Sequence, residues 1–213
     1  MRKKLFLIIS IFFIASLIIG QSSNLTLDVL YKDIFTDNYE VLENGVKLQY
    51  YTKTNLEEEK NRIINILSIN NYNQKISKNS IYVNGDRNNI KFEIKGSLNH
   101  KGNFIEIQAI ENNNKINIMN LQKKLSKIKD KYIEDEQYFT FTKGKLIKNS
   151  DEKSRLNKLF KEKKAKENET ISISSGITSR VKLKNELQIN YSLCDYNSGT
   201  YLIVGTPIIF IEY

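Results

Sequence analysis

The order of expected secondary-structure elements occurs twice along the chain, and this repetition constrains the fold more than any other feature. In the first half, a strand over 46–50 precedes an amphipathic helix that begins near Leu56, and several strands follow. In the second half, a strand over 138–142 precedes a helix with an apolar face around Leu156, and strands again follow. We therefore expect an α+β fold whose two strand–helix–strands pseudo-repeats form one curved antiparallel sheet, with helices on one face.

Local signals set the expected boundaries of these elements. Asn84-Gly85 is a strong hairpin signal, and Pro207 before the apolar run 208–211 predicts an edge strand or a bulge. The chain before residue 45 is poorly patterned and is expected to form a short helix or an arm. A cap is expected before each helix at either of two residues: Thr54 or Asn55, and Ser150 or Asp151.

The chain opens with the pattern of an export signal. Three basic residues at 2–4 precede an uncharged apolar run over 5–19, and small or polar residues follow. The run is about 15 residues, whereas a free-standing membrane span needs about 20. We expect an extracytoplasmic protein, either secreted or anchored to the outer face of the cytoplasmic membrane. The expected segments are a signal peptide or signal anchor over 1–22 and a single domain over 23–213, with halves at about 45–133 and 137–213.

Charge and composition narrow the partners and the chemistry. The net charge of +9 falls to +6 without residues 1–22, and a positive charge suits an anionic partner. Lys is abundant throughout the chain, so the charge is only weak evidence for such a partner. Cys194 is the only cysteine and lies in a strand pattern that predicts a buried thiol, while His100, the only histidine, lies in an expected turn. These two residues cannot form a His/Cys metal site or a Cys–His or Ser–His–Asp system. Since no phosphate loop or nucleophile elbow is present either, we expect no catalytic residue, no metal and no cofactor.

The C-terminus resembles a known family. Val204-Gly205-Thr206-Pro207-Ile208-Ile209 through Glu212-Tyr213 is similar to the terminus of the YwmB family, and the aromatic-Thr strand over 138–142 with Lys143-Gly144-Lys145-Leu146 resembles the family's middle. The specific match covers about the last 75 residues, and the first half matches in layout only. The family consists of exported proteins of sporulating, low-G+C Gram-positive bacteria. The resemblance implies a fold like that of TATA-box-binding protein and a role in sporulation or wall assembly, but no functional residues.

That fold raises nucleic-acid binding as an alternative function. A TATA-box binder lays an apolar sheet on the minor groove and wedges Phe side chains between base steps. Here the strand faces opposite the apolar ones are polar: Lys91, Glu93, Lys95, Glu106, Gln108, Gln188, Asn190 and Ser192. Carboxylates on such a face repel phosphates, and fold similarity alone does not transfer function. We therefore rank nucleic-acid binding behind envelope binding, and a wall hydrolase behind both.

The polar strand residues are the candidate binding site. The candidates are Lys91, Lys95, Gln188, Asn190 and Ser192. Tyrosines in the strands serve either for core packing or for stacking on sugar rings, and the lysine-rich helices are either solvated or a dock for phosphate-rich polymer or anionic lipid. The sequence thus favours a non-catalytic domain that binds a cell-wall polymer or an envelope protein. Membrane contact is expected only through the N-terminal segment, if it is uncleaved.

Overall fold

The computed structural model describes residues 27–148 and 150–211, in which a strand, a helix and four strands occur in that order twice. The first half contains β1 (Tyr39–Thr52), α2 (Leu56–Leu67), β2 (Asn71–Ile76), β3 (Ser80–Arg87), β4 (Ile90–Asn99) and β5 (Gly102–Asn112), followed by α3 (Ile118–Ser126). The second half contains β6 (Ile133–Leu146), α4 (Glu152–Glu162), β7 (Glu167–Ile173), β8 (Gly176–Lys182), β9 (Gln188–Tyr196) and β10 (Gly199–Thr206). Residues 27–34 form a further helix ahead of β1.

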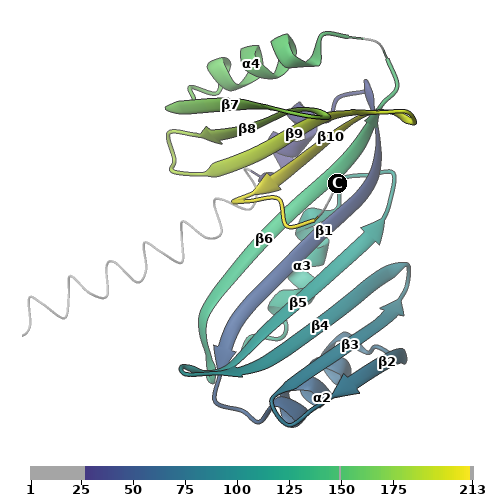
Figure 1. Ribbon diagram of the computed structural model, residues 1–213, viewed down its shortest axis with the longest axis vertical. Coiled ribbons are helices and arrows are strands. Elements are labelled where there is room, and N and C mark those ends of the chain that lie inside the picture. Colours follow the sequence, from purple (N-terminus) through teal and green to yellow (C-terminus); the bar gives the residue numbers. More distant parts are fainter. Residues whose placement is uncertain (1–26, 149, 212–213) are drawn as a thin grey trace, which may run out of the picture.

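The strands form one sheet, which confirms the expected α+β class and antiparallel pairing. Its order is β2-β3-β4-β5-β1-β6-β10-β9-β8-β7. The long strands β1 and β6 lie side by side at the centre and join the two halves of an elongated molecule (Figure 1). Val46 faces Thr140 near the middle of this ladder. The expected signal over 1–22 and the terminal Tyr213 lie outside the described residues.

The helices pack on one side of the sheet, here called the helix face. Val46, Leu48 and Tyr50 of β1 are buried in one core with α2 and α3. In the other core, Phe160 of α4 stacks on Tyr191 of β9 with ring centroids 5.5 Å apart. The helix over 27–34 packs into this second core. Each core is therefore completed by the helix that precedes the first strand of the other half.

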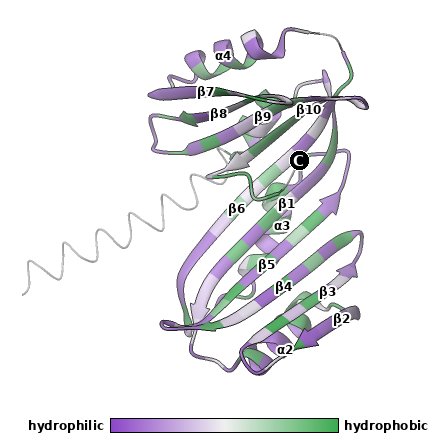
Figure 2. Ribbon diagram, viewed as in Figure 1, coloured by the Kyte–Doolittle hydropathy of each residue, from purple (hydrophilic) through white to green (hydrophobic). Residues whose placement is uncertain are grey.

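The opposite side of the sheet, here called the open face, carries polar side chains. Because successive side chains of a strand point to opposite faces, β4 and β5 show alternating hydrophobic and hydrophilic bands (Figure 2). No helix among the described residues is long and apolar enough to span a membrane.

A buried cluster of Tyr, Glu and Arg ties α2 to its surroundings. Glu59 is fully buried and accepts a hydrogen bond from the Tyr50 hydroxyl of β1. Arg62 donates from Nη2 to Glu59 Oε1 over 2.6 Å and from Nη1 to the Ile128 carbonyl after α3 over 2.7 Å. The cluster therefore connects the sheet, α2 and the chain that leaves α3.

The same type of cluster occurs in the second half. Glu152 of α4 accepts a hydrogen bond from the Tyr39 hydroxyl over 2.6 Å, and Arg155 Nε donates to it over 2.6 Å. Arg155 Nη2 also donates to the Ile34 carbonyl, at the end of the helix over 27–34. Both helices carry the sequence Glu-Lys-x-Arg at this place.

Several expected local features are confirmed. Asn55 caps α2 by accepting the Glu57 N–H over 2.8 Å, and Asp151 caps α4 by accepting the Ser154 N–H over 3.1 Å. Cys194 is a buried free thiol. The turn around His100 joins β4 to β5.

Two expected boundaries are wrong. Asn84-Gly85 lies inside β3, and the turn falls at 88–89, where both asparagines have positive φ. Glycine is needed at position 85 because a Cβ there would lie 2.7 Å from the Asn71 carbonyl oxygen. The run 208–211 is not a strand, since after Thr206 the chain leaves β10 and crosses the open face (Figure 1).

Candidate binding site on the open sheet face

The open face of the first half is a polar surface that no described helix covers (Figure 1). On β4, Lys91, Glu93 and Lys95 alternate with three buried apolar residues and therefore project from the open face. The register across β2, β3, β4, β5 and β1 aligns the polar residues into two rows. The first row is Asn73, Asn84, Glu93, Gln108 and Lys47. The second row is Lys75, Tyr82, Lys95, Glu106 and Gln49.

Glu106 holds the two rows together. It accepts hydrogen bonds from Gln49 Nε2 over 2.6 Å and from Gln108 Nε2 over 3.0 Å, and Lys47 Nζ lies 3.6 Å from Oε2. Burial opposes its ionisation, but the two amides and the charges of Lys47 and Lys95 outweigh burial and lower the pKa of Glu106. Glu106 is therefore an ionised anchor that orients the two amides.

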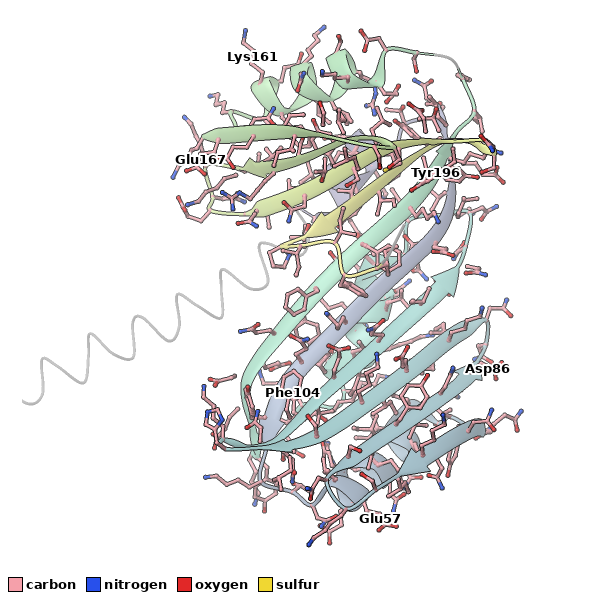
Figure 3. The ribbon with its side chains drawn as sticks, viewed as in Figure 1. Glu57, Asp86, Phe104, Lys161, Glu167 and Tyr196 are labelled. Carbon is pink, nitrogen blue, oxygen red and sulfur yellow. The ribbon has the colours of Figure 1, made fainter. Side chains whose placement is uncertain are left out.

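The predicted site residues Lys91 and Lys95 both lie on β4, and Lys95 is opposite Glu106 in the β4–β5 register. Lys95 Nζ is 2.5 Å from Glu93 Oε1, and this hydrogen bond raises the pKa of Lys95. Lys91 lines a surface hollow of about 690 Å³ at the corner of β2, β3 and β4, the corner where Asp86 is labelled in Figure 3. Its other lining residues are Asn70, Asn71, Tyr72, Asn73, Asn84, Gly85 and Asp86. This corner thus adds further amide groups to the polar rows.

Aromatic rings border the rows. Tyr51 of β1 faces Phe104 of β5 across the strands, with ring centroids 5.3 Å apart, and Phe104 is labelled in Figure 3. Lys101 Nζ lies 5.4 Å from the Tyr51 ring centroid. Tyr82 lies within the second row and is partly exposed. Apolar ring faces and hydrogen-bonding groups therefore occur together on this surface.

The segment over 207–211, here called the C-terminal tail, covers the centre of the open face. The Phe210 ring packs edge-to-face on Phe141 of β6 with centroids 5.1 Å apart. Lys47 Nζ lies 4.8 Å from the Phe139 centroid and 5.0 Å from the Phe210 centroid. Phe141 lies on the same face of β6 as Phe139, which is the open face. It is nevertheless completely buried.

The other predicted site residues, Gln188, Asn190 and Ser192, lie on β9 in the second half, where they bind the tail or the neighbouring strand. Gln188 Nε2 and Asn190 Nδ2 both donate to the Pro207 carbonyl, over 3.3 and 2.5 Å. Ser192 is buried and its hydroxyl donates to Thr178 Oγ1 over 3.0 Å. The structure thus brings Lys91 and Lys95 together on one half of the open face and places Gln188, Asn190 and Ser192 on the other half.

Sequence reasoning did not include the residues that complete the first-half surface. Lys47 and Gln49 alternate with buried apolar residues of β1, so the strand pattern carried the necessary signal. The pairing of Tyr51 with Phe104 depends on the β1–β5 register, which the sequence does not specify. The tail was not predicted either, because its apolar run reads as a strand.

The charge of the first-half surface is nearly balanced. Lysines and carboxylates alternate on it: Lys47, Lys75, Lys91 and Lys95 against Asp86, Glu93 and Glu106. Such a surface offers little net attraction to a polyanion. It is suited to an uncharged ligand that has many hydroxyl or amide groups.

No protein-family model matches the chain, and no curated protein matches its sequence.

Proposed function

We propose that this chain is an exported, non-catalytic domain of the bacterial cell envelope that binds a wall polysaccharide through the open face of its first half. The observation that carries the proposal is the pair of polar rows beside the Tyr51–Phe104 ring pair on an uncovered sheet face. Export rests on the basic and apolar pattern over 2–19.

The chemistry of the surface favours a glycan over other envelope polymers. Sugar hydroxyl and acetamido groups exchange hydrogen bonds with amides such as those of Gln49, Gln108 and Asn84. Sugar rings can stack on an aromatic ring such as that of Tyr82, which is partly exposed. The amides of Gln49 and Gln108 are pre-oriented by Glu106, which lowers the entropic cost of binding. A continuous, uncovered sheet surface fits an extended polymer strand.

The open face is not suited to glycan hydrolysis. A glycosidase needs a carboxylic acid whose pKa is raised so that it carries a proton near neutral pH. Glu106 has a lowered pKa, and both of its oxygens accept hydrogen bonds. Glu93 is bound to Lys95. These observations support binding without catalysis.

Nucleic-acid binding through the same face is less well supported. The carboxylates of Asp86, Glu93 and Glu106 interrupt the lysines on the first-half surface. The phenylalanines of β6 that could serve as wedges lie under or beside the C-terminal tail, and Phe141 is completely buried. An envelope polymer therefore remains the better ligand.

We further propose that the two halves are related repeats, with the saddle-like arrangement of TATA-box-binding protein, and that the chain belongs with the YwmB family. Support for the repeats comes from the matching order of elements and from the Glu-Lys-x-Arg clusters at Glu59–Arg62 and Glu152–Arg155. Support for the family is the sequence resemblance at the C-terminus and over 138–146 alone. A role in wall assembly or sporulation follows only from that membership.

Titration with a soluble glycan tests the proposed function. We would measure binding of an N-acetylglucosamine hexamer by calorimetry for the whole chain, for Tyr82→Ala on the open face and for Tyr132→Ala as a matched control at an exposed residue. Tyr82→Ala should weaken binding about tenfold, because stacking and apolar contact are lost, and Tyr132→Ala should leave it unchanged. Equal affinities of all three proteins would place the glycan elsewhere, and no binding would remove this ligand class.

A further inference from the structure

A cationic cleft lies on the helix face of the first half, away from the polar rows. It is formed where the end of α2, the turn between β3 and β4, and α3 meet. One cavity, of about 190 Å³, is lined by Ile66, Leu67, Arg87, Asn88, Ile90, Phe92, Lys124 and Lys127. A second cavity, of about 260 Å³, shares Lys124 and Lys127 and extends along α3 to Asn117, Asn120 and Lys123.

Within the part of the chain that the structure describes, no carboxylate pairs with the cations of this cleft. Neither cavity has a carboxylate in its lining. Among residues 27–148 and 150–211, many lysines and arginines form ion pairs, but Lys123, Lys124 and Lys127 do not. Arg87 is fixed at the rim because its Nη1 donates to the Leu67 carbonyl over 2.9 Å. The nearby Glu111 accepts the Asn117 amide over 2.5 Å and lines neither cavity.

The cleft combines two kinds of surface. Its rim carries ammonium, guanidinium and amide donors, which are the groups that bind phosphate oxygens. Its floor is apolar and consists of Ile66, Leu67, Ile90 and Phe92. Each cavity is smaller than the pockets of about 300 to 1,000 Å³ that hold drug-sized ligands. The space therefore fits a small head group with a short apolar part.

We propose that this cleft binds a phosphate ester that has an apolar substituent. The phosphate lies among Arg87, Lys124 and Lys127, and the substituent lies against the apolar floor. The site faces away from the open face and does not depend on glycan binding there. Its ligand class is that of an anionic phospholipid head group.

Soluble probes and matched charge variants test this site in the whole chain. The probes are dihexanoyl phosphatidylglycerol below its micelle concentration, glycerol 3-phosphate, which lacks the apolar part, and dihexanoyl phosphatidylcholine, which lacks the net charge. The variant is K124Q/K127Q. The control is K158Q/K161Q, which removes the same charge from exposed positions of α4, where Lys161 projects away from the sheet (Figure 3). Urea unfolding midpoints would be measured to check that both variants fold.

The lipid with net negative charge should bind, and K124Q/K127Q should weaken its binding by about tenfold or more, while K158Q/K161Q should not. Glycerol 3-phosphate should bind more weakly than the lipid. The proposal is overturned if the control variant loses as much affinity as K124Q/K127Q, if phosphatidylcholine binds as tightly as phosphatidylglycerol, or if no probe binds. Equal binding of glycerol 3-phosphate and the lipid would refute the role of the apolar floor.

Discussion

At the scale of single residues, three neighbouring glutamates of α2 have different roles, because they lie on different sides of the helix. Glu57, Glu58 and Glu59 form one acidic run, which by sequence alone suits the solvated first turn of a helix. Glu57, labelled in Figure 3, and Glu58 are indeed exposed. Glu59 is instead fully buried and bound to Tyr50 and Arg62. The sequence could not predict this cluster, because it depends on how α2 docks on β1.

Removal of the Glu59 carboxylate should be costly. Glu59→Ala leaves the Tyr50 hydroxyl and the Arg62 guanidinium without their buried acceptor. Arg62 keeps its ion pair with Asp130, at 3.1 Å, so the main loss is the buried acceptor of the Tyr50 hydroxyl. The free energy of unfolding should therefore fall by about 1–3 kcal/mol. Glu57→Ala, at an exposed position, should change it by no more than about 0.5 kcal/mol. Urea unfolding measures both, and a small effect of Glu59→Ala would show that the cluster does not stabilise the fold.

The carboxylate of Glu106 should make stability depend on pH. Its pKa in the folded protein is lower than the ordinary value of 4.5. Folding therefore favours its ionised form, so its contribution is present above pH 4.5 and is lost as the pH falls through the folded-state pKa. Glu106→Gln lacks this titrating group. Between about pH 7 and about pH 3, the free energy of unfolding should therefore fall less for Glu106→Gln than for the native chain. Identical pH profiles from urea unfolding would contradict this assignment.

At the scale of elements, predictions held where local chemistry decides the structure. Asn55 and Asp151 cap their helices as expected, because a cap involves only neighbouring residues. The sequence did not indicate β2, whose residues are all exposed and mostly polar, since an edge strand without a buried face lacks apolar alternation. The tail was predicted as a strand and is not one. Its course is set by contacts with distant residues, including Phe141 and Asn190.

The tail should stabilise the molecule through Phe210. Phe210→Ala removes the ring that covers Phe141 and contacts Lys47. Because Phe210 is only partly buried, the free energy of unfolding should fall by about 1–3 kcal/mol, less than for a fully buried phenylalanine. Ile208→Ala, at an exposed position of the same tail, should have little effect. Similar unfolding curves for both variants and the native chain would mean that the tail does not protect the centre of the face.

At the scale of the whole molecule, one sheet separates two different surfaces. The open face of the first half is polar and nearly balanced in charge, while the opposite side carries the cationic cleft beside α3. The sequence predicted the polar alternation on β4 and β9 but placed all candidate residues in one site. The structure divides them, because β5, β1, β6 and β10 lie between β4 and β9 in the sheet. On the β9 side, Gln188 and Asn190 hold the tail.

The most direct test of the central claim is co-sedimentation of the whole chain with isolated cell-wall sacculi at low and physiological salt. Binding to a wall glycan through hydrogen bonds and ring stacking should survive physiological salt, because it does not depend on counterion release. Tyr82→Ala should reduce the bound fraction and Tyr132→Ala should not. Binding at low salt only, or an equal bound fraction for both variants, would contradict glycan binding by the open face.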